Sequence, residues 1–97
     1  MKAIFITYNQ ALTDPVMTVL NKWGVRGFTK WVDTQGRGSV NGDPHYGSHA
    51  WPEMNSSILA VTTEEKSESV LKALRELDSE MEAQGLRAFV WNIETQL

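Results

Sequence analysis

The sequence has no cysteine, only three prolines and no long hydrophobic run. Without cysteine there can be neither a disulfide framework nor a thiolate metal site. No apolar run approaches the roughly 20 residues that a membrane-spanning helix needs. The apolar stretch at residues 3–6 is also too short for the core of a signal peptide. We therefore expect a cytoplasmic protein that does not insert into a membrane.

Positive charge is scarce as well. Nine Lys and Arg residues face twelve Asp and Glu residues, which gives a net charge of −3 and a pI near 5.3. A nucleic-acid-binding domain usually carries a basic face, and the basic residues of this chain do not cluster. The composition therefore predicts no nucleic-acid partner.

Hydrophobic residues, in contrast, are abundant for so short a chain. The 97 residues indicate a single domain, residues 1–97, and 41% of them are hydrophobic, four tryptophans included. A domain of this size buries only a little over ~60% of its unfolded surface. Association with further copies of the chain is a natural way to cover the remaining apolar groups.

Hydrophobic periodicity predicts six regular elements. They are a strand at 3–8, a helix at 14–23, strands at 28–32 and 56–63, a helix at 64–84 and a strand at 86–93. This βαββαβ order is typical of an α+β, ferredoxin-like fold, in which both helices cover one face of an antiparallel sheet. Apolar residues occur on both faces of the strands, so the second face requires another subunit or a partner.

A long loop joins the second and third predicted strands. Residues 35–54 contain most of the glycines and both histidines, whereas a connection in a compact domain typically has roughly 4–6 residues. Long loops with polar and aromatic side chains are often binding surfaces. Within this loop, Gly36, Arg37 and Gly38 can offer backbone N–H groups and a guanidinium to an anion, or simply form a turn.

Four segments of the chain resemble the PII and PII-like signalling proteins, and the resemblance runs nearly full length. These segments are KAIFITY at 2–8, GVRGFT at 24–29, Gly36-Arg37 followed by Gly42, and GLRAFVW at 85–91. The resemblance implies a homotrimer whose sheets face the threefold axis. It also implies that loop 36–55 binds a partner, commonly a membrane transporter or an enzyme.

The resemblance also implies a nucleotide site. PII proteins bind adenine nucleotides between subunits, and Thr29, Gly36, Arg37 and Arg87 resemble residues at or near that site. Yet the chain leaves no room before its last strand for the family's phosphate-binding segment, and no basic tail follows Ile93. We therefore expect ATP to bind weakly or not at all. The loop also lacks the Tyr-Arg-Gly segment of nitrogen-sensing members and is more similar to divergent PII-like proteins of metal-efflux or anion-transport systems.

The two histidines suggest a different ligand. His45 and His49 lie four residues apart, with Asp43 and Glu53 on either side. Imidazole and carboxylate groups together suit Zn²⁺, Cu²⁺ or Ni²⁺. Two interpretations stay open: a divalent transition-metal site, or solvent-exposed histidines that hydrogen-bond within the loop. Trp51, in the same loop, is either an anchor for a partner or packed against its own domain.

Taken together, these patterns predict a non-catalytic, trimeric PII-like regulator. Its long loop would sense a small ligand or a divalent metal and bind a partner such as a transporter. No cysteine nucleophile and no Gly-x-Ser-x-Gly segment is present, so we assign no catalytic residue. The alternatives are a small metal- or ligand-binding enzyme on a ferredoxin-like scaffold, a nucleotide-binding nitrogen regulator, and a structural oligomerisation module.

Overall fold

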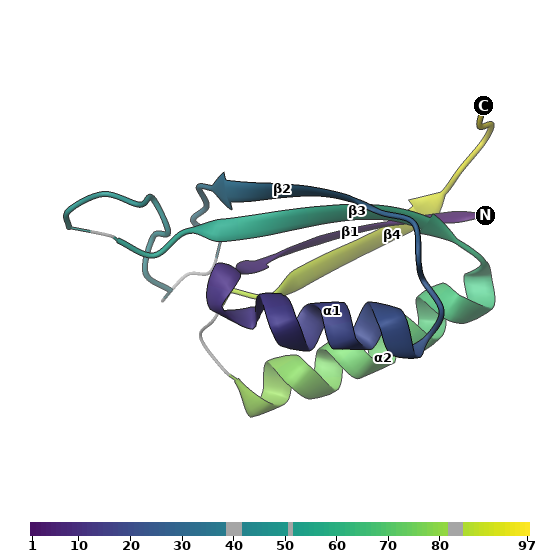
Figure 1. The fold of residues 1–97 in the computed structure, drawn as a ribbon, viewed down its shortest axis with the longest axis horizontal. Helices are drawn as coiled ribbons and strands as arrows, with labels where there is room; N and C mark the ends of the chain where they lie inside the picture. The colour runs from purple at the N-terminus through teal and green to yellow at the C-terminus, as the bar shows by residue number, and fades with distance from the viewer. Residues whose placement is uncertain (39–41, 51, 82–84) are drawn as a thin grey trace.

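The chain folds into a four-stranded antiparallel sheet with two helices on one face (Figure 1). The structure, a computed structural model, describes residues 1–38, 42–50, 52–81 and 85–97. In chain order the elements are β1 (Lys2–Asn9), the 3₁₀ turn η1 (Gln10–Leu12), α1 (Thr13–Lys22), β2 (Thr29–Thr34), β3 (Asn55–Thr62), α2 (Glu64–Glu80) and β4 (Arg87–Asn92). The strand order is β2-β3-β1-β4. The predicted ferredoxin-like fold is therefore confirmed.

The hydrophobic core lies between the sheet and the helices. Ile4, Ile6 and Tyr8 alternate along β1 and are fully buried on the helix side. Two residues of each helix complete the central layer, namely Val16 and Leu20 of α1 and Val70 and Leu74 of α2. Their spacing of four residues places each pair on one side of its helix. The apolar stripes read from the sequence thus form the core.

The two helices begin differently. Thr63 caps α2, since its hydroxyl accepts a hydrogen bond from the N–H of Lys66 at 3.2 Å. Helix α1 instead follows the 3₁₀ turn directly, with Leu12 at the capping position and no capping side chain. The Thr13 hydroxyl donates to the carbonyl of Gln10 at 2.6 Å. The backbone is therefore already helical where α1 begins.

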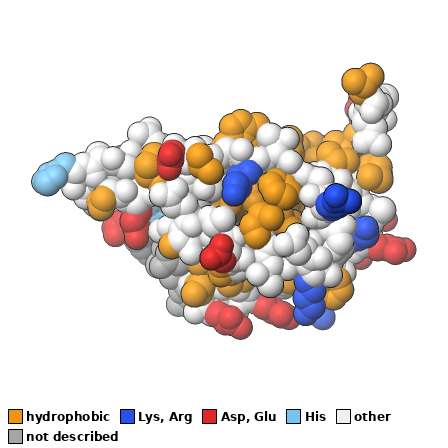
Figure 2. Space-filling view, viewed as in Figure 1, with side chains coloured by type: hydrophobic (Ala, Val, Ile, Leu, Met, Phe, Trp, Pro, Cys, Tyr) orange, Lys and Arg blue, Asp and Glu red, His pale blue; other side chains and the backbone are white. Residues whose placement is uncertain are grey.

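The face of the sheet opposite the helices is bare and apolar within one chain. Phe5 pairs with Leu59 on one side and Phe89 on the other, so all three side chains share this face. Ala3, Val61 and Trp91 form the next row, in which Val61 is 41% and Trp91 48% exposed. Figure 2 shows hydrophobic side chains along the upper edge of the molecule, where the sheet lies. This agrees with the expectation that the second face requires a cover.

A β-bulge ends β2 and directs the chain into the long loop. The register between β2 and β3 shifts between Trp31 and Thr34, and Asp33 takes a positive φ of 56°. Beyond the bulge, Thr34 pairs with Asn55, the first residue of β3. Both ends of the loop therefore leave the sheet at the same place.

Among the helices described, none is long and apolar enough to cross a membrane.

Candidate functional site

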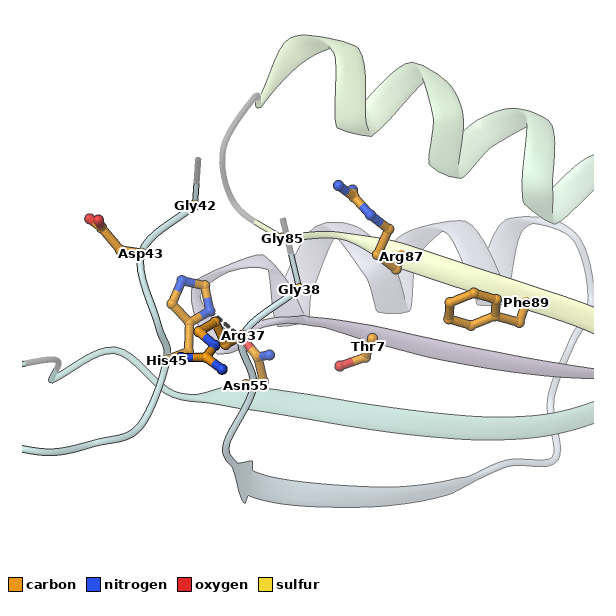
Figure 3. A pocket seen from close by; sticks show the side chains of 11 residues that line it. Thr7, Arg37, Gly38, Gly42, Asp43, His45, Asn55, Gly85, Arg87 and Phe89 are labelled. Atoms are coloured by element: carbon orange, nitrogen blue, oxygen red, sulfur yellow. Dashed lines mark hydrogen bonds between the residues drawn. The ribbon is translucent and has the colours of Figure 1, made fainter. Parts of the chain in front are cut away.

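A pocket of about 260 Å³ lies at the end of the sheet where the long loop leaves it (Figure 3). Strands β1, β3 and β4 each contribute to its wall, because β1 ends here and β3 and β4 begin here. The loop and the connection before β4 supply the rest. The lining residues are Thr7, Gly36, Arg37, Gly38, Gly42, Asp43, His45, Asn55, Gly85, Arg87 and Phe89.

Backbone hydrogen bonds divide the long loop into two parts. Gly36 and His45 form a two-way bridge, with N···O distances of 2.9 and 2.7 Å. Further out, the N–H of Gly47 donates to the carbonyl of Glu53 at 3.0 Å. We call residues 37–38 and 42–44 the inner lobe, because four of them line the pocket. Residues 48–50 and 52 form the outer lobe.

His45 is the side chain that holds these parts together. It is 5% exposed, and its Nδ1 lies 2.6 Å from Oδ1 of Asn55. Its Nε2 lies 3.2 Å from a carboxylate oxygen of Glu53, on the far side of the outer lobe. A Cβ placed on Gly85 would stand 3.5 Å from the imidazole ring, so the chain before β4 also packs on it. The imidazole therefore joins the loop to β3 and to the start of β4.

Gly36 fits the same arrangement because it has no side chain. A Cβ at this position would stand 2.6 Å from the amide nitrogen of Asn55, closer than real Cβ contacts allow. The backbone of the loop can therefore approach the Asn55 amide directly. This close approach places Arg37, the next residue, in the wall of the pocket.

The charges around the pocket favour an anion. Arg37 and Arg87 both line it, and neither takes part in the ion pairs found between described residues, Lys2–Glu64 and His45–Glu53. One nitrogen of Arg87 donates to the carbonyl of Leu86 at 2.7 Å. Asp43 also lines the pocket, but its carboxylate points away from the other labelled side chains (Figure 3). Guanidinium groups without a carboxylate partner are ready donors to an oxyanion.

The structure brings together most of the residues predicted to bind a cofactor. Gly36, Arg37, Gly38 and Arg87 all line the pocket. Thr29 does not, because it begins β2 and pairs with Leu59, at the end of the strand away from the loop. The sequence reasoning missed Thr7, Gly42, Asn55, Gly85 and Phe89. Of these, only Asn55 offered a local signal, as a polar residue directly after the loop.

The part of the chain that the structure describes does not form the predicted metal site. The described residues contain no group of three or more His, Cys, Asp or Glu side chains that could hold a metal ion. His45 uses both ring nitrogens on Asn55 and Glu53, whereas His49 is exposed. Asp43 lines the pocket without joining this pair. Trp51, predicted to be either an anchor for a partner or packed against its own domain, lies outside the described residues.

Comparison with solved structures reveals close similarity of fold to PII-like proteins. CPII, a nitrogen regulatory PII-like protein from Thiomonas intermedia K12 bound to ADP, AMP and bicarbonate, gives a TM-score of 0.77 at 23% identity over 95% of this chain and 84% of that one. CPII bound to ADP and bicarbonate gives 0.75 at 25% identity over the same shares. A PII-like signalling protein from Thermus thermophilus gives 0.67 at 22% identity over 95% and 85%. A comparison with curated proteins gives no significant match.

These structures correct the prediction about cofactors. We expected a divalent transition metal and doubted that a nucleotide binds. That prediction is wrong, because the similar CPII structures hold ADP, AMP and bicarbonate and the described residues offer no metal site. The error arose from treating a histidine between two carboxylates as a metal ligand, when its partners are an amide and one carboxylate.

The resemblance seen in the sequence is confirmed at the level of the family. The four-stranded antiparallel sheet, the two helices and the strand order agree with the fold of the PII-like structures. The family model named "Nitrogen regulatory protein P-II" matches residues 1–96. The chain therefore belongs to the P-II family.

Proposed function

We propose that this chain is a non-catalytic PII-like regulatory protein that binds an adenine nucleotide of the ADP or AMP type at the pocket beneath its long loop. One observation carries the proposal. Arg37 and Arg87 line a single pocket, and no described carboxylate forms an ion pair with either of them. Two such guanidinium groups suit phosphate oxygens, which they bind in forked geometry.

The size of the pocket indicates which part of the nucleotide it holds. At about 260 Å³ it is smaller than the roughly 300–1,000 Å³ that usually encloses a whole small-molecule ligand. We propose that it takes the phosphates, with Gly36, Gly38 and Gly42 allowing the backbone to approach them closely. The base would lie against a neighbouring subunit, which could supply Thr29 from the far end of its β2.

The related structures support a nucleotide ligand and also a small anion. ADP, AMP and bicarbonate are bound by CPII, and all three carry an oxyanion that a guanidinium can meet. We propose bicarbonate as a second ligand of the same region, since a small planar anion fits a pocket of this volume.

Isothermal titration calorimetry with ADP, AMP and bicarbonate tests this proposal. The wild type should bind ADP, and Arg37→Gln and Arg87→Gln should each weaken it roughly 10- to 100-fold, the equivalent of about 1.5–3 kcal/mol for a lost charged hydrogen bond. Lys72→Gln is the matched control, because Lys72 is exposed on α2 and does not line this pocket. No heat of binding at millimolar ligand, or equal losses in all three variants, would refute the proposed site.

We also propose that the protein is a homotrimer in which the bare sheet face is covered. Apolar side chains on this face are exposed side by side, Phe89 at 56% and Trp91 at 48% among them, and a contiguous apolar patch of this kind marks an interaction surface. Sedimentation equilibrium should give a mass of three 10.9 kDa chains. Val61→Lys should dissociate the trimer, whereas Met81→Lys should leave it assembled. The two residues are 41% and 43% exposed, but Met81 follows α2 on the other side of the molecule. A wild-type monomer would contradict this part.

The remaining part of the proposal concerns the partner. We propose that the outer lobe, where His49 and Ala50 are exposed, contacts a membrane transporter or an enzyme, and that the protein acts in the cytoplasm. Co-sedimentation with the membrane fraction, with and without ADP, tests the transporter. A variant with a Gly-Ser linker in place of residues 48–50 should lose co-sedimentation while it still binds ADP. If this variant co-sediments like the wild type, the outer lobe is not the contact surface.

A further inference from the structure

His45 has two acceptors and is buried between four segments of the chain. Its backbone is bonded to Gly36, its Nδ1 faces Oδ1 of Asn55, and its Nε2 faces the carboxylate of Glu53. Gly85 packs against the ring. No other described residue ties the inner lobe, the outer lobe, β3 and the connection before β4 together in this way. The imidazole therefore sets the position of the whole loop root.

The hydrogen-bond requirements of this site define a protonation state. An amide oxygen and a carboxylate both accept hydrogen bonds, so the ring must donate from both nitrogens to satisfy both. Only the imidazolium form carries two N–H groups. A neutral ring would leave either the buried Asn55 oxygen or the Glu53 carboxylate facing a lone pair. Losing the Glu53 contact costs less, because the Glu53 side chain is 56% exposed and can turn to water.

We propose that His45 is a positioning residue for the nucleotide pocket, which fixes the inner lobe and Arg37 through its hydrogen bond to Asn55. This inference rests on the proposed nucleotide site. The two-way bridge holds Gly36 to the backbone of His45, and the side chain of His45 holds that backbone to β3. If the side-chain contact is lost, the bridge is free to move away from the sheet. Arg37, one residue from the bridge, would then leave the pocket.

The charge of the ring adds a second effect. The charged groups around it are Glu53 in direct contact, Arg37 and Asp43 from the inner lobe, and Arg87 from β4. An imidazolium in this setting both completes its own contacts and adds positive charge beside a bound anion. Histidine changes charge between about pH 5 and 8. Nucleotide affinity should therefore fall as pH rises through this range, and nucleotide binding should in turn favour the protonated ring.

Two substitutions separate the contacts of the ring. In His45→Asn the amide nitrogen can take the place of Nδ1 and still donate to Asn55. In His45→Gln it can take the place of Nε2 and reach Glu53, leaving Asn55 unpaired. We expect His45→Gln to weaken ADP binding roughly tenfold, as for one lost charged hydrogen bond, and His45→Asn to weaken it by no more than about threefold. His49→Gln, an exposed histidine of the same loop, should match the wild type.

The pH profile distinguishes positioning from simple packing. Between pH 6 and 8 the ADP dissociation constant of the wild type and of His49→Gln should rise roughly fivefold more than that of His45→Asn, a coupling at the low end of the usual range. The titration of ADP itself is common to all three proteins and cancels. NMR of the histidine rings gives a readout that needs no variant, since ADP should shift the ring resonances of His45 and leave those of His49 unaltered.

The outcomes are separable. Two results would overturn the role of His45 while leaving the nucleotide site intact. One is equal ADP affinities for His45→Gln and His45→Asn. The other is a pH dependence of ADP affinity in the wild type that does not differ from that of His45→Asn. Unaltered His45 ring resonances on addition of ADP would do the same. A wild type that binds no ADP at any pH would overturn the proposed function and this inference together.

Discussion

The hydroxyl of Tyr8 is a buried polar group without a hydrogen-bond partner among the described residues. Tyr8 is fully buried in the core, near the end of β1 and two residues before the 3₁₀ turn. Burial raises the pKa of its phenol, and the nearby hydroxyls of Thr13 and Ser56 offset only part of that rise. The Thr13 hydroxyl is directed elsewhere, to the carbonyl of Gln10 at 2.6 Å. Tyr8→Phe should therefore remove an unfavourable group rather than an interaction.

The size of the effect follows from the cost of burying an unpaired hydroxyl, which mutational data place at about 1–3 kcal/mol. The fold tolerates the change in shape, because phenylalanine has the same ring in the same place. We expect Tyr8→Phe to raise the free energy of unfolding at pH 7 by about 1 kcal/mol. The control is Tyr46→Phe in the long loop, where the side chain is only partly buried and the change should stay within about 0.5 kcal/mol.

The raised pKa adds a dependence on pH with a definite sign. The folded state holds the phenolic proton more tightly than the unfolded state. The contribution of the protonated Tyr8 to the free energy of unfolding is therefore fully present below the unfolded tyrosine pKa of about 10. It is lost as pH rises from there through the folded pKa. Wild-type stability should thus fall above about pH 10, and Tyr8→Phe should lack that part of the fall.

Urea denaturation followed by far-UV circular dichroism, from pH 7 to 11, measures both effects. All proteins are compared at one protomer concentration, because association contributes to the apparent stability. A Tyr8→Phe protein that is less stable than the wild type at pH 7 would show that the hydroxyl makes a favourable contact. Identical alkaline losses in the two proteins would show that Tyr8 is not the group that titrates.

Two further substitutions test the local structure by urea denaturation. Thr63→Ala removes the cap that accepts from Lys66 and should cost about 1 kcal/mol, so an unchanged midpoint would mean that the first turn of α2 needs no cap. Gly36→Ala places a Cβ 2.6 Å from the amide of Asn55 and should both destabilise the protein by about 1–3 kcal/mol and weaken ADP binding. Gly38→Ala, with nothing within 4 Å of its Cβ, should leave the stability unchanged; equal losses of stability in the two variants would refute the close approach.

The fold could be predicted because its signals are local. A spacing of four residues between Val70 and Leu74, or alternation along β1, fixes which side of an element is apolar, and both patterns are read directly from neighbouring residues. The boundaries were less accurate where a distant partner decides them. The second strand was expected at 28–32 but runs over Thr29–Thr34, because its end is set by pairing with Asn55 across the bulge.

The candidate site was predictable only where the family resemblance reached it. That resemblance supplied Gly36, Arg37 and Arg87, which the structure places in one pocket. His45 was identified as important, yet its role was misread. The spacing of histidines and carboxylates describes what lies nearby in sequence, whereas the contact that decides the role is with Asn55, ten residues away. No local pattern indicates that an amide at the start of a strand will receive that ring.

The long loop illustrates why local patterns do not predict the site. A single connection of about 20 residues would be costly to order, because each fixed backbone residue loses roughly 1–2 kcal/mol of conformational entropy. The chain avoids one large loop by bonding Gly36 to His45 and Gly47 to Glu53, which leaves two short lobes. The side chain of His45 lies against Asn55 and Glu53, so both bonded pairs are joined to the start of β3 through one side chain. A ligand that strengthens the His45–Asn55 contact should also strengthen the Gly36–His45 bridge, and the ADP titrations of the His45 variants measure this coupling.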